Sequence, residues 1–398
     1  MLYRNISANA CHDSRERFPP PRCHPSTRKE ILATIMDHVR ETPSSFEVLY
    51  MYGEAPSSMI LLLFGSEGTG KSAIAQTIAE HCKSKGTLGA SFFFSRVSSD
   101  RNTDKNLIAT LAYQLCMNVP EMKRFIVKAV EDDLSTFQKD LDTQMERLII
   151  NPVIQATEEG IMSLSFPTII VVDGLDECEG VKEQSAFLRA IGSAMERHNL
   201  PLYFFITSRP EARIVNLLNQ DRVMGLLSHQ LNLDQNHIQT KKDIEEYFRS
   251  EFERIRIAHH MPNSLVWPSQ SNIQALVSKT NMLFSHASEL MGFIDDQKDT
   301  PQNRLEDILR PSSSSGQSSR SEVLLATSAG TDRVQPKPKT SFKEKTGTVL
   351  TGRVEVDGLR YRRRPNIKSD AIGQYPIGTK ISITGFTEEG TTVVKGDA

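Results

Sequence analysis

The sequence has no long apolar run. Nowhere does it reach the roughly 18 consecutive apolar residues that a membrane-spanning helix needs. Its opening residues contain no apolar core of signal-peptide length, so we expect a soluble, cytoplasmic protein without a membrane partner. The sequence also has no large excess of positive or negative charge, because the net charge of the 398 residues is -2. That balance indicates no general polyanion partner, and we expect no nucleic acid.

Cysteine is scarce and no internal repeat is visible. The five cysteines show neither disulfide nor zinc spacing, which favours a reducing compartment. The pairs Cys11-His12 and Cys23-His24 lack the C-x-x-C pattern, so we expect no zinc there. The absence of a repeat argues against a solenoid.

The most informative segment that is present is "GSEGTGKS", residues 65–72, between the apolar run "MILLLF" and the helical pattern "AIAQTIAEHC". A glycine, four residues and then Gly-Lys-Ser predict a loop whose backbone N–H groups bind phosphates. The predicted binding residues are Gly65, Ser66, Glu67, Gly68, Thr69, Gly70, Lys71 and Ser72. A plain glycine-rich turn is the alternative.

Each loop residue type has an expected task. Gly65 and Gly70 should supply backbone angles that are closed to other residues. Lys71 should reach the terminal phosphates, and the hydroxyl of Ser72 should join a magnesium shell.

Strand and helix signals alternate after the loop, which predicts an α/β fold with a parallel sheet and helices on both faces. The expected strands are "MILLLFG", "GASFFFS", "TIIVVDG", "LYFFITS" and the shorter "HQLNL". Ile74, Ala75, Ile78 and Ala79 should form the buried face of the helix after the loop.

Two features precede the loop. Thr27 and Glu30 have the spacing of a capping box and predict the start of a helix in "STRKEILATIMDHV". The run "FEVLYMYG", residues 46–53, is a second strand-like segment, but Gly53 is not followed by the lysine of a phosphate loop. An extra edge strand, a misplaced loop and a gene-model insertion all fit this run.

Acidic residues follow the strand of "VVDGLDEC". Asp173 closes the strand, where a carboxylate can hold Mg²⁺ opposite Ser72. Asp176 and Glu177 come within one further turn, and one of them is expected to polarise a water for attack on the terminal phosphate.

Arginines follow two other strands. Arg209, in "FFITSRPE", can neutralise the γ-phosphate, although an ordinary surface arginine is the alternative. Arg96 and Arg101 are weaker candidates for the same task.

The motifs, the strand and helix signals and the composition together divide the chain into an irregular segment 1–25, an α/β core 26–235 with the phosphate loop, a helical cap 236–310, a flexible Ser- and Pro-rich linker 311–345 and a small β module 346–398. The cap begins with an apolar stripe formed by Ile244, Tyr247, Phe248, Phe252 and Ile255. The basic run "YRRRP" in the β module is too short to indicate nucleic acid and favours a solvated turn.

The motifs "GSEGTGKSAIAQTIAE", "ASFFFSR", "TLAYQL", "VVDGLDEC" and "FFITSRPE" together resemble the NACHT NTPase domain of fungal signal-transduction ATPases. That group is similar to nephrocystin-3-type and heterokaryon-incompatibility proteins and is related to NOD-like immune receptors of the STAND class. The resemblance implies that residues 65–72 bind phosphates, Asp173 binds magnesium, Asp176 and Glu177 assist hydrolysis and Arg209 is a sensor.

The chain departs from this pattern in its C-terminal part. "SKTNMLFSHASELMGF" stands where relatives carry a Gly-Gly pair before the cap helix. The segment "VEVDGLRYRRRPNIKSDAIGQYPIGTKISITG" resembles a bacterial-type SH3-like domain without its last strand.

Three functions compete at this point. The first is a signalling switch in which ATP or GTP with Mg²⁺ closes the cap and slow hydrolysis resets it, with self-association or other signalling proteins as partners. The second is a nucleotide-binding scaffold without turnover. The third is an adaptor that acts through the SH3-like module.

Overall fold

The computed structural model describes residues 1–41, 59–160, 168–198, 200–262, 267–296 and 298–310, together with strands near the C-terminus. The strand-like run 46–53 and most of the expected linker, residues 311–342, lie outside the described residues. The chain divides into two units, Met1–Gly330 and Thr331–Ala398.

In the described part of the first unit, five parallel strands form one sheet in the order β2-β3-β4-β1-β5. Their bounds are β1 Ile60–Phe64, β2 Leu88–Phe93, β3 Thr168–Asp173, β4 Leu202–Ser208 and β5 Ser228–Asn232. All carboxyl ends therefore lie at the same edge of the sheet. The predicted parallel α/β sheet is confirmed.

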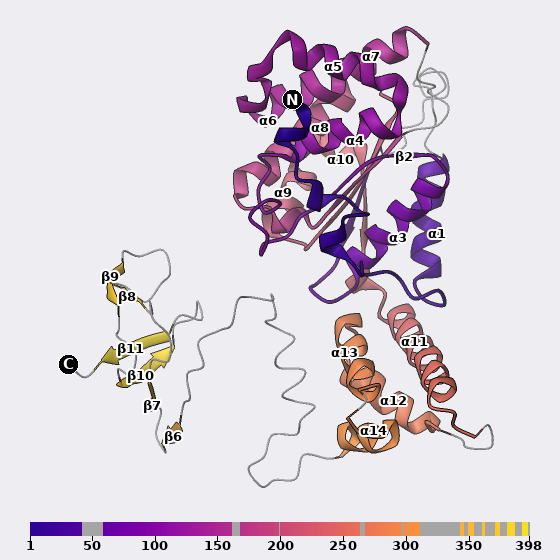
Figure 1. The fold of residues 1–398 in the computed structure, drawn as a ribbon, viewed down its shortest axis with the longest axis vertical. Coiled ribbons are helices and arrows are strands. Elements are labelled where there is room, and N and C mark those ends of the chain that lie inside the picture. The colour runs from indigo at the N-terminus through magenta and orange to yellow at the C-terminus, as the bar shows by residue number, and fades with distance from the viewer. Residues whose placement is uncertain are drawn as a thin grey trace. The chain divides into compact units, whose positions relative to one another are not determined.

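Helices cover both faces of this sheet (Figure 1). Ile60 and Leu62 pack on one face in a large core with other helices, whereas Leu61 and Leu63 pack on the opposite face. The first face is covered by α4 Leu107–Asn118, α5 Lys123–Asp132, α6 Leu141–Met145, α7 Asn151–Glu158, α8 Val181–Arg197, α9 Ala212–Gln220 and α10 Arg222–Leu227. The second is covered by α1 Lys29–Glu41 and α3 Lys71–Ser84. The predicted apolar face of α3 is fully buried.

The start of α1 differs from the prediction. Arg28 has a left-handed backbone with φ 57°, so the helix begins only at Lys29. The hydroxyl of Thr27 donates to the carbonyl of His24 at 3.0 Å. Glu30 is then the second helical residue and not the third, so the predicted capping box is wrong.

The chain before α1 packs against the core rather than lying apart from it. It contains the short 3-10 turns Leu2–Asn5, Ala8–Ala10 and Arg15–Arg17. The backbone N–H of His12 donates to the Ser91 hydroxyl of β2, and the Arg17 guanidinium donates to Gln76 of α3 at 2.8 Å. Ala10 is fully buried in the core.

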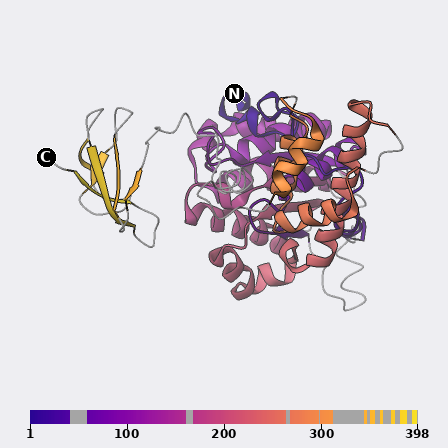
Figure 2. The ribbon, with the colours of Figure 1, turned by 90° about the horizontal axis from the view of Figure 1, so that it is seen from below.

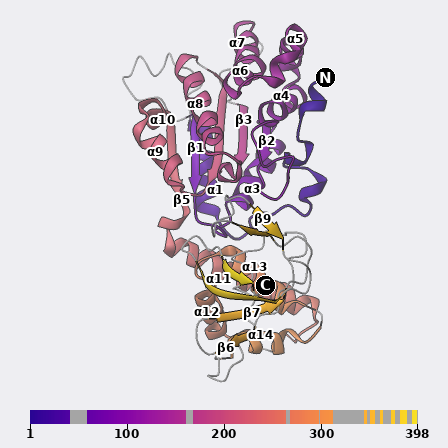
Figure 3. The ribbon, with the colours of Figure 1, turned by 90° about the vertical axis from the view of Figure 1, so that its left-hand side faces the viewer.

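The cap is a helical layer with its own core (Figures 2 and 3). It consists of α11 His237–Ala258, α12 Gln270–Lys279, α13 Phe284–Ile294 and α14 Pro301–Leu309. The predicted stripe on α11 is buried there, with Tyr247 only partly buried. The ring of Trp267 meets Phe252 edge-on with centroids 5.1 Å apart.

The second unit contains antiparallel strands in the orders β11-β10-β7-β6 and β8-β9. Their bounds are β6 Lys343–Lys345, β7 Val349–Arg353, β8 Arg360–Arg362, β9 Ala371–Gln374, β10 Lys380–Phe386 and β11 Thr392–Gly396. These strands agree with the expected β character, and the SH3-like assignment stays a prediction. Among the described helices, none combines the length and apolar character needed to span a membrane.

Candidate functional site: a glycine loop beside an acidic strand end

The loop 65–72 runs from the end of β1 into the start of α3, as the sequence predicts. Gly68 and Gly70 have left-handed backbones, with φ of 79° and 93°. Gly65 does not, so its predicted unusual backbone angle is wrong. Gly65 instead provides room, because an added Cβ would lie 2.6 Å from the Thr69 hydroxyl and 3.2 Å from Leu233 Cβ.

Lys71 closes the loop on itself. Its ammonium group donates to the carbonyl oxygens of Gly65 at 2.7 Å and Ser66 at 2.9 Å. Burial lowers the pKa of Lys71, while the negative charges of Asp176 and Asp173 oppose that shift. The ammonium group is thus held by two carbonyl oxygens of the loop, and the charges of nearby acids favour its protonated form.

Asp234 supports the other side of the loop. It follows β5, and its carboxylate accepts hydrogen bonds from the backbone N–H of Ser66 at 2.9 Å and from the Ser66 hydroxyl at 2.8 Å. Asp234 was not predicted from the sequence, because it belongs to no motif. Only the pairing of β5 with β1 brings Asp234 beside the loop.

Ser72 and Asp173 meet at the edge of the sheet. The Asp173 carboxyl is buried and accepts a hydrogen bond from the Thr207 hydroxyl at 2.6 Å. Burial raises the pKa of Asp173, and hydrogen bonds from Thr207 and Ser72 oppose the rise. The two oxygens proposed for magnesium therefore face one another.

Asp176 is fully engaged by arginines. One carboxylate oxygen accepts from the backbone N–H of Arg209 at 2.8 Å, and the other accepts from Arg209 Nε at 2.7 Å and Arg96 at 3.3 Å. Burial raises the pKa of Asp176, and the charges of Lys71 and Arg96 oppose the rise. Both of its oxygens already accept hydrogen bonds, so a water molecule would have to displace an arginine contact. Its geometry suits a structural anchor for Arg209.

Glu177 has a different environment. One of its oxygens accepts from the backbone N–H of Arg96 at 3.2 Å. Burial raises the pKa of Glu177 to about 7, with the charges of Asp173 and Asp176 adding to the rise. A carboxyl with this pKa is suited to accept a proton near neutral pH.

Arg209 bridges the acidic strand end and the loop. Besides Asp176, its guanidinium pairs with Glu67 of the loop at 3.5 Å. Arg101, a weaker candidate, donates to the Phe93 carbonyl at 3.0 Å and so supports the end of β2. Arg96 belongs to the site, because its side chain donates to Asp176 and its backbone N–H donates to Glu177.

A magnesium ion would find oxygen donors here but no complete protein cage. The described residues contain no group of three or more His, Cys, Asp or Glu side chains that could hold a metal. Ser72 and Asp173 supply a hydroxyl and a carboxylate, which are ligands that Mg²⁺ accepts alongside phosphate and water oxygens.

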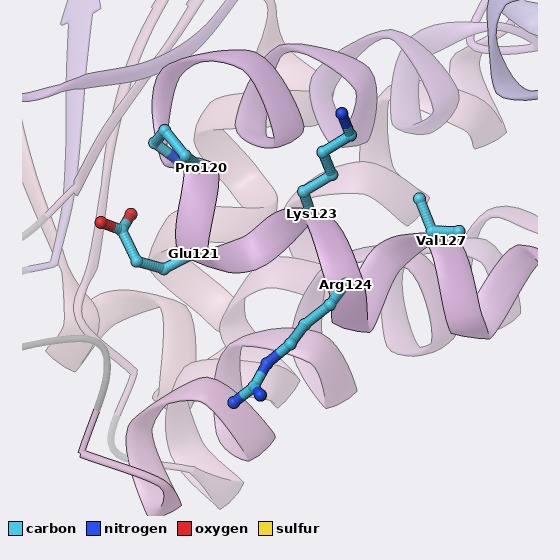
Figure 4. A pocket seen from close by; sticks show the side chains of 5 residues that line it. All are labelled: Pro120, Glu121, Lys123, Arg124 and Val127. Carbon is cyan, nitrogen blue, oxygen red and sulfur yellow. The ribbon is translucent and has the colours of Figure 1, made fainter.

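A surface hollow of about 670 Å³ lies elsewhere, on the turn before α5 and on α5 itself (Figure 4). Its lining residues are Pro120, Glu121, Lys123, Arg124 and Val127. None of the predicted site residues contributes to it.

The loop between a buried strand and a helix, the acid at the end of a parallel strand and the helices on both sheet faces define a P-loop NTPase fold. Within it, residues 27–209 match the family model described as "Nephrocystin 3, N-terminal". No curated protein sequence matches the chain significantly.

Solved structures give weaker similarities. A Rhizobiales Trip13 structure is 14% identical, with 73% of this chain and 91% of that chain covered at a TM-score of 0.35. For C. elegans PCH-2 the identity is 11%, the coverage is 70% and 68%, and the TM-score is 0.38. For the FIGL-1 AAA domain in complex with ADP the identity is 13%, the coverage is 77% and 89%, and the TM-score is 0.36.

Proposed function

We propose that this protein binds ATP or GTP with Mg²⁺ at the loop 65–72 and hydrolyses it slowly, as a signal-transduction switch. The observation that carries the proposal is the meeting of the Ser72 hydroxyl and the Asp173 carboxyl near the half-buried ammonium group of Lys71. A plain glycine-rich turn requires neither the acid nor the lysine.

The residues of the site divide the work. Backbone N–H groups of the loop and Lys71 bind the phosphates, with Lys71 exchanging its carbonyl partners for phosphate oxygens. Ser72 and Asp173 hold the magnesium ion, which neutralises phosphate charge when bound. Glu177 accepts the proton of the attacking water, and Arg209 faces the terminal phosphate after leaving Glu67.

The cap gives the switch a moving part. The backbone N–H at Ser285, in the first turn of α13, donates to the Gly68 carbonyl at 3.1 Å. A ligand that alters the loop therefore changes a contact that the cap also uses, as a switch requires. The family match over residues 27–209 supports the NACHT-type reading, with other signalling proteins or a second copy as partners in the cytoplasm.

Binding is tested first. Purified wild type should bind ATP or GTP in the presence of Mg²⁺ by calorimetry, and mass spectrometry of co-purified nucleotide identifies the base. Lys71→Ala should abolish binding, whereas Lys85→Ala, at the exposed end of the same helix, should not. Asp173→Asn should bind with reduced magnesium dependence. Undiminished affinity of Lys71→Ala would show that the site is wrong.

Hydrolysis is tested separately by single-turnover measurements. Glu177→Gln should keep nucleotide affinity and lose hydrolysis, by a factor of about 100 or more. Glu179→Gln, an exposed neighbour, is the matched control. Equal background rates in wild type and Glu177→Gln would support the scaffold without turnover in place of the switch.

A further inference from the structure

The side chain of Arg28 lies where the phosphate loop meets the cap. It is only 6% exposed although it belongs to the segment before α1. Its guanidinium donates to the Thr69 carbonyl of the loop at 2.9 Å and to the Thr240 hydroxyl of α11 at 3.1 Å. The same group stacks over the ring of Phe284 in α13, 4.7 Å from its centroid. One side chain thus touches the loop and two cap helices.

A buried acid from the cap balances this cation. Asp243 of α11 is 5% exposed, and its charge opposes the lowering of the Arg28 pKa that burial causes. Arg28 in turn opposes the rise that burial causes in the pKa of Asp243. Within the described residues, Arg28 Nε and Asp243 Oδ2 are buried without a hydrogen-bond partner. Separating Arg28 from Asp243 would leave a buried charge uncompensated, which is strongly destabilising. The pair therefore favours contact between the segment before α1 and the cap.

The bond to Thr69 also acts on the loop. In a planar trans peptide the C=O and N–H groups point in opposite directions. Holding the Thr69 carbonyl from the cap side therefore turns the Gly70 N–H toward the opposite side of the loop. The preceding carbonyl, that of Gly68, is held in the same way by the Ser285 N–H. A cation on the carbonyl also polarises the peptide and strengthens its N–H as a donor.

We propose that Arg28 is a positioning residue that aims the Thr69–Gly70 peptide at the phosphates and transmits the occupancy of the loop to the helical cap. This inference depends on the proposed nucleotide binding. The planar guanidinium reaches two oxygens and an aromatic face at once, which a lysine ammonium on one stem does not match.

The test compares Arg28→Ala and Arg28→Lys with Arg22→Ala in the full-length protein. Arg22 is a matched control from the same segment, since it pairs with Glu80 at the surface and its side chain is 57% exposed. The affinity for ATP and GTP with Mg²⁺ should fall about tenfold or more in Arg28→Ala. It should fall less in Arg28→Lys and stay within about twofold in Arg22→Ala.

Hydrogen exchange of α11 and α13, measured with and without saturating nucleotide, separates coupling from folding. In wild type, nucleotide should change the exchange of both helices, and in Arg28→Ala this difference should vanish even when the loop is saturated. Thr240→Val, which removes only the cap partner of Arg28, should keep most of the affinity but lose the difference in α11.

The outcomes are distinct. If wild type binds nucleotide but Arg28→Ala binds equally well, the positioning role is overturned while the proposed function stands. If Thr240→Val keeps the full nucleotide-dependent exchange difference, the transmission to the cap is overturned. If wild type itself binds neither ATP nor GTP, the proposed function falls and this inference falls with it.

Discussion

Asp176 and Glu177 are neighbours in the chain but have different surroundings. Both residues follow β3 closely enough for either one to polarise a water molecule. The sequence therefore could not show which of the two is the catalytic base. Burial raises the pKa of both carboxyls, that of Glu177 to about 7. Both oxygens of Asp176 accept hydrogen bonds from Arg209 or Arg96, whereas Glu177 accepts one from the backbone N–H of Arg96. The difference arises because β4 pairs with β3, so Arg209, the residue after β4, lies next to Asp176 and donates hydrogen bonds to it.

The pH dependence of hydrolysis follows from Glu177. A base must be deprotonated, so single-turnover rates at saturating nucleotide should rise with pH through a midpoint of about 7 and then level off. Arg96→Ala removes a positive charge that lowers the pKa of Glu177, so the midpoint should move to higher pH. A midpoint that does not respond to Arg96→Ala would assign the titration to another group, such as the nucleotide.

Glycines at left-handed positions allow a matched comparison. Gly68→Ala should lower the free energy of unfolding by about 1 kcal/mol or more from backbone strain alone. It should also weaken the contact with the cap, because the new Cβ would lie 2.3 Å from the Ser285 hydroxyl. Gly86→Ala is the control, with φ 70° and open space around it.

Urea unfolding of the two variants should show the larger loss for Gly68→Ala, and nucleotide affinity should fall only there. Equal losses in both variants would mean that the contact between loop and cap has no energetic weight. Gly65 is also required for a steric reason, because a side chain there would lie too close to Leu233. This contact joins residues far apart in the sequence, so the sequence alone could not reveal it.

At the scale of elements, strong apolar patterns predicted the positions of strands and helices, whereas a capping signal misplaced one helix start. The strands around Asp173 and Thr207 and the helices α3 and α11 occur where their periodicity placed them. The short helix α10 was not predicted, because so few turns carry little periodic signal. The helices α6 and α7 were also not predicted, although with the π-helical turn Glu146–Ile150 between them they form one continuous helix over residues 141–158. The capping box predicted the wrong start for α1. Arg28 has a left-handed backbone and contacts the phosphate loop, so the helix begins only at Lys29.

The cap helices form an element with a separate core that can be weakened on its own. Phe252→Ala removes a buried ring and should cost about 3–5 kcal/mol of cap stability. Trp267, the one tryptophan of the sequence, packs on that ring, so its fluorescence should shift to the red in the variant. Ile257→Ala, on the same helix but 67% exposed, should change neither property measurably. An unchanged emission in Phe252→Ala would contradict the packing of Trp267.

At the scale of the whole molecule, the order of the strands was beyond the sequence. Alternating signals gave a parallel sheet, but they did not show that β4 lies between β1 and β3 or that β5 borders β1. These neighbours bring Thr207 to Asp173 and Asp234 to Ser66. The loop residues were predictable from local spacing, whereas the residues that support them come from distant segments.

The division into two units leads to a truncation test. A protein that ends at Gly330 keeps the loop, the acids and the cap, which all belong to the first unit. Its nucleotide affinity should stay within about twofold of the full-length value, since the described cores around the site consist of residues of the first unit. A loss of more than tenfold, in a truncated protein with a normal unfolding transition, would show that the second unit takes part in binding.

The hydrogen bonds of Lys71 to its own loop have a kinetic consequence. Because Gly65 and Ser66 satisfy the ammonium group, the loop needs no ligand to keep its shape. Most of the conformational entropy of the loop is therefore lost already when the chain folds. On binding, phosphate oxygens only replace the two carbonyl oxygens as partners of Lys71. The entry of the phosphates into the loop should then be fast, without a slow rearrangement of the loop itself.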